Sequence, residues 1–144
     1  TMCYRFTKQQ NYLDAAHKIA RFIIDHRPSE NDYVPYWDYD APVTKETPRD
    51  VSAASVTASA MIELSTMVPD GQKYLDYAEK ILKSLSSDAY LAKVGDNQGF
   101  ILMHSVGSLP NGSEIDSPLN YADYYYLEAL KRFMDLKGIN YKDI

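Results

Sequence analysis

The sequence predicts an all-α protein with about four main helices. Apolar residues recur every three or four positions over residues 9–27 and 72–85, as on the buried face of an amphipathic helix. A run of small residues over 49–67 and a stretch rich in Tyr and Leu over 118–137 predict two further helices. The length of 144 residues fits one domain, so we treat residues 1–144 as a single segment.

An internal repeat supports this helical prediction. The segment YLDAAHKI at residues 12–19 resembles YLDYAEKI at residues 74–81, and 74 − 12 gives an offset of 62 residues. The run of small residues lies between the two copies. Self-similarity at such a period is typical of stacked helical hairpins, although two amphipathic helices can also resemble each other by chance.

The helix boundaries follow from local signals. Pro28 ends the first helix, Pro48 suits the first turn of the second, and Asp50 or Ser52 can cap the backbone N–H groups there. Asp70 can cap the third helix, and Gly138 ends the last. The small residues of the second helix predict an inner, crowded position. We expect the chain to begin within a helix.

The remaining segments read as irregular connections. Residues 29–47 contain two prolines and show no regular hydrophobic period, which predicts a long loop. Residues 86–97 could be a frayed helix or a loop, and residues 99–104 could form one short extended piece. Residues 105–117 are rich in Gly, Ser, Pro and Asn and are predicted to be a loop.

Composition argues against several function classes. The formal net charge is −5, with acidic and basic residues mixed along the chain, so no basic face for nucleic acid or anionic membranes is expected. No apolar run reaches the roughly 20 residues of a membrane span. Cys3 is the only cysteine and the three histidines are scattered, so we expect no disulfide, metal or cofactor.

The candidate site lies around the only tryptophan, Trp37. Asp38 and Asp40 stand beside it, and Asp50 and Ser52 follow where a helix is predicted to begin. Polar groups at a helix entrance next to an aromatic platform indicate a sugar-binding or acid–base site. Helix capping is the competing explanation for Asp50.

Several motifs follow one another along nearly the whole chain. They are PYWDYDAP at 35–42, PRDVSAA at 48–54, HSVG at 104–107 and YADYYYLEAL at 121–130. In this order they resemble the C-terminal part of the unsaturated glucuronyl hydrolases, a bacterial glycoside hydrolase family numbered eighty-eight. The resemblance implies a barrel of six helical hairpins, an (α/α)6 toroid, of which the four helices of this chain would supply about the last third.

The resemblance also implies a reaction. In the family an aspartate acts as general acid and base while water adds across the C4=C5 double bond of an unsaturated uronic acid, and the hemiketal formed opens to release the neighbouring sugar. The family's aspartates for this chemistry lie in its N-terminal half. No catalytic residue is therefore expected here, and Asp38 and Asp40 are not assigned that role.

The expected site residues are those of substrate binding. The loop 109–116 matches the family's late loop at the sugar leaving group, which implies contacts from Asn111, Gly112 and Ser113. Side chains expected to line or brace the cleft, with capping and loop bracing as the alternative, are Trp37, Asp38, Asp50, Ser52 and Asp123.

We first expect the chain to be a fragment of a hydrolase, and we expect this fragment to be inactive by itself. Its partner would be an unsaturated uronic-acid oligosaccharide in the intact parent, and its exposed apolar helix faces predict self-association. Two alternatives remain, a small helical carbohydrate-binding or interaction module without catalysis and a different helical-barrel enzyme related to sugar epimerases. Both bacterial periplasm and cytoplasm fit.

Overall fold

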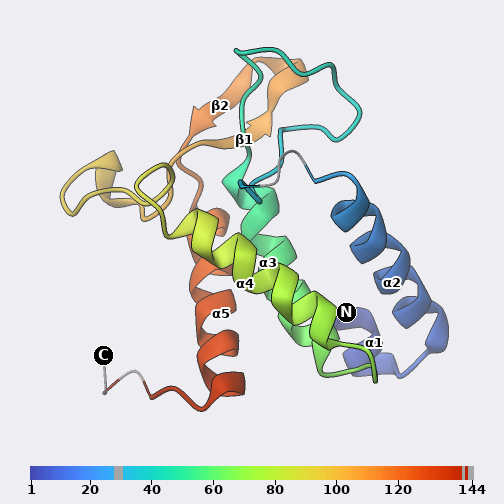
Figure 1. The fold of residues 1–144 in the computed structure, drawn as a ribbon. Helices are drawn as coiled ribbons and strands as arrows, with labels where there is room; N and C mark the ends of the chain where they lie inside the picture. Colours follow the sequence, from blue (N-terminus) through green and yellow to red (C-terminus); the bar gives the residue numbers. More distant parts are fainter. Residues whose placement is uncertain (28–30, 141, 143–144) are drawn as a thin grey trace.

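The computed structural model describes residues 1–27, 31–140 and 142, and within these ranges the protein is mostly helical (Figure 1). The four predicted long helices are confirmed. No helix of the described ranges is long and apolar enough to span a membrane. The elements are α1 (Met2–Thr7), α2 (Gln10–Asp25), α3 (Val51–Ser65), α4 (Gln72–Leu85), β1 (Ser105–Ser108), β2 (Ser113–Ser117) and α5 (Asn120–Lys137).

Helix α3 is the inner helix, as its small residues predicted. It packs against both α4 and α5, and ten of its 15 residues are buried. Alanine and serine side chains let the neighbouring helices approach closely. The buried Ser55 hydroxyl is satisfied within the helix, because its Oγ donates to the carbonyl oxygen of Val51 at 2.7 Å.

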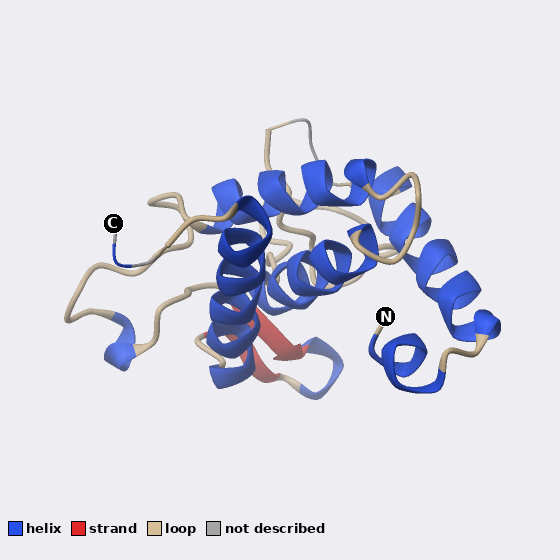
Figure 2. Cartoon of the chain, turned by 90° about the horizontal axis from the view of Figure 1, so that it is seen from below, coloured by secondary structure: helices blue, strands red, loops and turns tan. Residues whose placement is uncertain are grey.

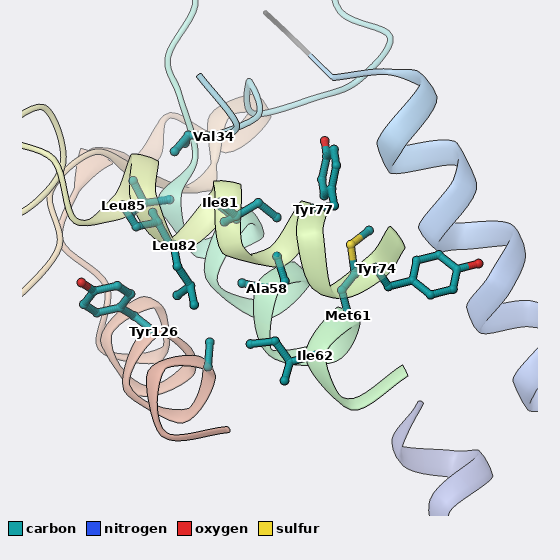
Figure 3. Close-up of a cluster of buried hydrophobic side chains, with 14 of the residues drawn as sticks. Val34, Ala58, Met61, Ile62, Tyr74, Tyr77, Ile81, Leu82, Leu85 and Tyr126 are labelled. Carbon is teal, nitrogen blue, oxygen red and sulfur yellow. The ribbon is translucent and has the colours of Figure 1, made fainter. Parts of the chain in front are cut away.

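The hydrophobic core lies between α3, α4 and α5 (Figure 3). Helix α4 contributes Tyr74, Ile81 and Leu85, all at most 1% exposed. Met61 and Ile62 of α3 are buried against this cluster. Burying each such large side chain stabilises the fold by roughly 1.5–3 kcal/mol.

Two hydrogen bonds from tyrosine side chains join helix α2 to α4. The Nδ1 atom of His17 lies 2.6 Å from the hydroxyl of Tyr74, and the hydroxyl of Tyr77 donates to the carbonyl oxygen of Ile23 at 3.4 Å. These contacts join α2 to α4, the two helices that carry the repeated segments. The repeat thus marks two helices that contact each other outside α3.

Several local predictions need correction. Helix α3 begins at Val51 with Asp50 as its N-cap, so Pro48 precedes the helix. The N-cap of α4 is Gly71, whereas Asp70 pairs with Lys73 on the surface. Pro28, the predicted end of the first helix, lies outside the described residues.

The predicted loop over 105–117 is a β-hairpin, whose two strands are red in Figure 2. Strands β1 and β2 pair antiparallel, with Val106 opposite Ile115 and Ser108 opposite Ser113. All of β2 except Ser117 is exposed, so its sequence shows no alternation of buried and exposed residues that would indicate a strand. The connecting turn ends at Gly112, which has φ 65° and suits glycine.

Alkaline pH should destabilise the protein through its buried and half-buried tyrosines. Burial, with nearby charge, raises the pKa of Tyr39 and of Tyr77 from 10.0 to about 12. Between these pH values the unfolded chain loses the phenolic proton and the folded chain keeps it. The free energy of unfolding therefore has its full value below pH 10 and falls as the pH rises to about 12.

Urea unfolding at a series of pH values measures this loss. The variant Tyr77→Phe should show a shallower decline than the native chain, because one of the phenols with a raised pKa no longer titrates. Tyr124→Phe, at an exposed position of α5, is the matched control and should keep the native slope. Identical slopes for all three proteins would contradict the assignment.

Candidate functional site

The carboxylate of Asp50 joins the start of α3 to the hairpin. Its Oδ1 atom accepts hydrogen bonds from the Ser52 backbone N–H at 2.9 Å, the Ser52 hydroxyl at 2.7 Å and the Val106 backbone N–H at 3.3 Å. Asp50 is 8% exposed. The capping role proposed for it is therefore confirmed, and the same oxygen also holds the hairpin against the helix.

A second backbone contact fixes the hairpin at the same place. The Val51 N–H donates to the carbonyl oxygen of His104 at 3.1 Å. The Nδ1 atom of His104 lies 2.5 Å from Oδ1 of Asp116, across the base of the hairpin. The start of α3 thus lies beside the side chains that emerge from both strands.

The loop that carries Trp37 returns to α3 through backbone pairing. Tyr36 and Arg49 form an isolated antiparallel bridge, and the Trp37 N–H donates to the carbonyl oxygen of Pro48 at 3.1 Å. The guanidinium of Arg49 covers the ring of Tyr36 at 4.0 Å. Trp37 is half-buried on this loop.

Asp38 holds the turn that follows Trp37. Its Oδ1 atom accepts from the backbone N–H groups of Asp40 at 2.7 Å and Ala41 at 3.2 Å. This is the local bracing typical of an aspartate in a turn. The structure therefore gives Asp38 a defined structural role.

Asp123 braces the segment before the hairpin. From the first turn of α5, its Oδ2 accepts from the Ile101 N–H at 2.8 Å and its Oδ1 from the Leu102 N–H at 2.9 Å. Leu102 is fully buried and forms a bridge with Leu91. Both oxygens of this carboxylate are thus used to hold backbone.

The three residues predicted to contact the leaving group form the far end of the hairpin. The Nδ2 atom of Asn111 donates to the Ser108 hydroxyl at 2.8 Å, while Gly112 and Ser113 are exposed. Sugar hydroxyls can hydrogen-bond to amide and hydroxyl groups of this kind. The structure leaves these three residues exposed to solvent at the end of the hairpin.

Sequence reasoning missed three polar residues at this junction, namely His104, Glu114 and Asp116. Glu114 lies so close to Gly107 that a Cβ at Gly107 would clash with the Glu114 side chain. Burial raises the pKa of Tyr121 at the start of α5; the side chain of Ser52 lowers it, and the charges of Asp50 and Glu114 raise it. The three residues were missed because pairing across a hairpin was not predicted.

Backbone strain concentrates in the same hairpin. His104, Glu114 and Asp116 all have positive φ, at 70°, 52° and 53°. His and Asp tolerate this region better than most residues, but Glu does not. Such conformations persist only where the surroundings hold them, and they cluster at functional sites. Among the described residues, no group of three or more His, Cys, Asp or Glu could hold a metal ion.

Replacing Asp50 should loosen the junction. Asp50→Ala removes the acceptor of three donors and should lower the free energy of unfolding by about 2 kcal/mol in urea titrations. Asp50→Asn keeps an oxygen at this position, so its free energy of unfolding should fall by less. Asp70→Ala, a surface acidic residue, is the control with little expected effect. Native stability in Asp50→Ala would contradict the role of this carboxylate.

No protein-family model matches the chain. The sequence is 46% identical to the unsaturated glucuronyl hydrolase of Formosa agariphila over 136 residues, which is 94% of this chain but 34% of that protein. The chain therefore spans about a third of the length of the curated relatives that it matches.

Solved structures agree with the sequence comparison. A crystal structure of an unsaturated glucuronyl hydrolase specific for heparin is 57% identical, with a TM-score of 0.91 over 96% of this chain and 37% of that chain. A Streptococcus agalactiae variant complexed with dGlcA-GalNAc6S is 28% identical, with a TM-score of 0.81 over 91% of this chain and 35% of that one. The fold matches part of their helical barrel. This chain is therefore a relative of the unsaturated glucuronyl hydrolases that matches a segment about one third as long as they are.

Proposed function

We propose that these 144 residues are the C-terminal part of an (α/α)6-barrel glycoside hydrolase that acts on unsaturated uronyl oligosaccharides. The observation that carries the proposal is the 46% identity to the Formosa agariphila hydrolase over 94% of this chain. The reaction would be hydration of the C4=C5 double bond, followed by opening of the hemiketal and release of the neighbouring sugar.

The engaged carboxylates support a chain that is inactive alone. Asp38, Asp50 and Asp123 each accept at least two backbone N–H groups. A general acid must give its proton to the substrate, and a carboxylate oxygen that accepts backbone N–H groups is poorly placed to do so. We assign these acids to bracing the site, and the proton-transferring aspartate to the part of the hydrolase outside this sequence.

The exposed groups at the end of the hairpin support a role in binding the substrate. Asn111, Gly112 and Ser113 are exposed there, and Trp37 offers a half-buried aromatic ring. Ser52 is buried, and its hydroxyl braces the helix entrance through Asp50. Two solved relatives contain the sugars dGlcA-GalNAc6S and dGlcA-Glc-Rha-Glc. We propose that the equivalent surface here meets the sugar next to the unsaturated uronate.

A chimera tests the proposed reaction. The upstream two thirds of the Formosa agariphila hydrolase are fused to these 144 residues, and loss of the ultraviolet absorbance of the C4=C5 bond is followed with an unsaturated uronyl disaccharide. We expect turnover by the chimera and none by the 144-residue chain. A folded but inactive chimera would overturn the proposal, and turnover by the short chain would overturn its inactivity.

The second candidate is a helical carbohydrate-binding module without catalysis. The complete use of both Asp123 oxygens for backbone contacts favours it, because the site then holds sugar without proton transfer. Calorimetry with the same disaccharide separates the candidates. Binding to the short chain together with a folded, inactive chimera would favour the module.

We also propose that the isolated chain self-associates through α5. Leu127 is 52% exposed, and a hollow of about 680 Å³ beside it is lined by further apolar residues, among them Leu130, Met134 and Ile139. Exposed apolar surface of this kind favours association.

Light scattering after size-exclusion chromatography measures this association. The native chain should form oligomers that dissociate on dilution, and Leu127→Lys should shift it to monomer because a charge would be buried at the contact. Val94→Lys, at a fully exposed loop position away from α5, is the control and should behave like the native chain. A native monomer at all concentrations would disprove the proposal.

A further inference from the structure

We infer that the groove between the C-terminal half of α4 and the loop at residues 31–33 binds an anionic sugar, a uronate or sulfated residue of a glycan chain, without converting it. This groove is a surface that the proposed function does not use. The choice of a glycan as the carrier of the anionic group rests on the proposed function, whereas the charge and the hydrogen-bond donors belong to the groove itself.

The groove has the size and the composition of a ligand site. Its volume of about 520 Å³ lies within the range of roughly 300–1,000 Å³ that is usual for such sites. Its lining includes Asp32, Tyr33, Lys80, Lys83, Ser84 and Tyr90. The groove therefore combines positive charge, hydroxyl groups and aromatic rings, which are the groups that hold a charged sugar.

Two lysines place positive charge on one wall of the groove. Lys80 and Lys83 are three residues apart on α4, so they lie on the same face of the helix. The Nζ atom of Lys80 lies 5.6 Å from the centre of the Tyr33 ring. Lys83 Nζ lies 2.9 Å from Glu79 Oε1, and the Lys83 side chain is 73% exposed. Because an ammonium has three N–H donors and an exposed ion pair is weak, both lysines can turn to an anionic ligand.

The acidic residue of the groove does not cancel this charge. Among the described residues that line the groove, only Asp32 is acidic, and its Oδ2 lies 3.5 Å from NH2 of Arg49. The same oxygen accepts the hydroxyl proton of Tyr90 at 2.6 Å. Burial, and then the Asp32 carboxylate, raise the pKa of Tyr90, so the phenol keeps this proton. The lining is therefore positive overall, although the whole chain carries a formal net charge of −5.

Serine and tyrosine groups supply contacts for the sugar itself. The Ser84 hydroxyl accepts the Tyr33 backbone N–H at 3.1 Å, and a hydroxyl that accepts one hydrogen bond can still donate its own proton. The Ser87 hydroxyl donates to the Ser84 carbonyl oxygen at 2.6 Å and can accept from a sugar hydroxyl. The ring of Tyr33 is held by an edge contact with Tyr77, with 5.3 Å between centroids. A small inorganic anion would use the lysines alone, so these groups favour a sugar.

Tyr90 connects the groove to the base of the hairpin. Its ring lies 6.3 Å from the ring of His104, and its carbonyl oxygen accepts the Met103 N–H at 2.9 Å. Tyr90 is 7% exposed and contacts both surfaces. A glycan chain held in the groove would therefore stay close to the hairpin, which raises its local concentration there.

Calorimetry and amide NMR on the 144-residue chain test this inference. The probe is a sulfated uronic-acid tetrasaccharide without a C4=C5 bond, and the comparison ligands are a neutral glucose tetrasaccharide and inorganic sulfate. We expect saturable binding of the sulfated tetrasaccharide that weakens as the salt concentration rises, no binding of the neutral one and much weaker binding of sulfate. Amide signals of residues 80–90 should shift, because these residues form one wall of the groove.

Charge variants on α4 give the test its specificity. The double variant with Lys80→Gln and Lys83→Gln should bind the sulfated tetrasaccharide roughly tenfold more weakly, and arginine at both positions should restore most of the affinity. Lys131→Gln is the matched control, because Lys131 is also an exposed lysine paired four residues away, with Asp135 at 2.7 Å, but lies on α5. It should bind like the native chain. Unchanged thermal unfolding shows that each variant is folded.

Four outcomes would overturn the inference. The first two are no binding of the sulfated tetrasaccharide to the native chain and equal binding to the double glutamine variant. Shifts confined to residues 105–117 would place the glycan at the hairpin instead. Sulfate that binds as tightly as the tetrasaccharide would make the groove a site for a free anion only.

The chimera described above separates this inference from the proposed function. An active chimera that does not bind the sulfated tetrasaccharide would refute the groove inference alone. A folded, inactive chimera that binds the tetrasaccharide, and loses this binding in the double glutamine variant, would refute the proposed function alone.

Discussion

The arrangement of the candidate site depends on one carboxylate oxygen, Oδ1 of Asp50. It accepts two donors from the start of α3 and one from Val106 in the hairpin, so the helix end and the hairpin share a single acceptor. The Asp50 N–H in turn donates to the carbonyl oxygen of Pro35 at 2.9 Å, which brings in the loop before Trp37. Three segments separated in sequence therefore meet at one buried residue, where an unpaired donor would be costly.

The other half of α3 is held by a different network. The Ser59 hydroxyl donates to Oε2 of Glu128 at 2.5 Å, and Arg132 donates to the Ser59 carbonyl oxygen at 2.9 Å. Arg132 also lies 3.3 Å from Glu63 and 3.2 Å from Glu128. Because these groups are partly buried and paired, they fix the register of α5 against α3, and the alanines between them bring the two helices close.

The helices were predictable because each carries its own local signal. The stripe of α2, the small residues of α3 and the glycine after α5 mark elements whose residues are near each other in sequence, and burial confirms α3 as the inner helix. The hairpin was not predictable in this way. Its second strand is almost wholly exposed, and the pairing of Val106 with Ile115 is a tertiary contact without a hydrophobic pattern.

The difference between local signals and tertiary contacts also explains which residues of the candidate site were predicted. Asp50 was identified because N-caps have a local sequence signature, and Asp123 because it opens a helix, but the backbone groups that Asp123 holds lie 21 and 22 residues away. His104 and Asp116 face each other only after the hairpin forms. Residues whose role depends on strand register cannot be recognised from the amino-acid sequence alone.

The strained hairpin shows why a rigid helical frame and a polar site occur together here. Each residue in the left-handed region costs of order 1 kcal/mol or more, and Glu114 lacks the tolerance of Asp or His. The hairpin can keep this geometry because His104 and Val106 are tied to the start of α3, which itself is buried between α4 and α5. Packing in the helical core thus supplies the free energy that holds exposed polar side chains in one arrangement, and such preorganisation lowers the entropic cost of binding any ligand there, including the sugar proposed above.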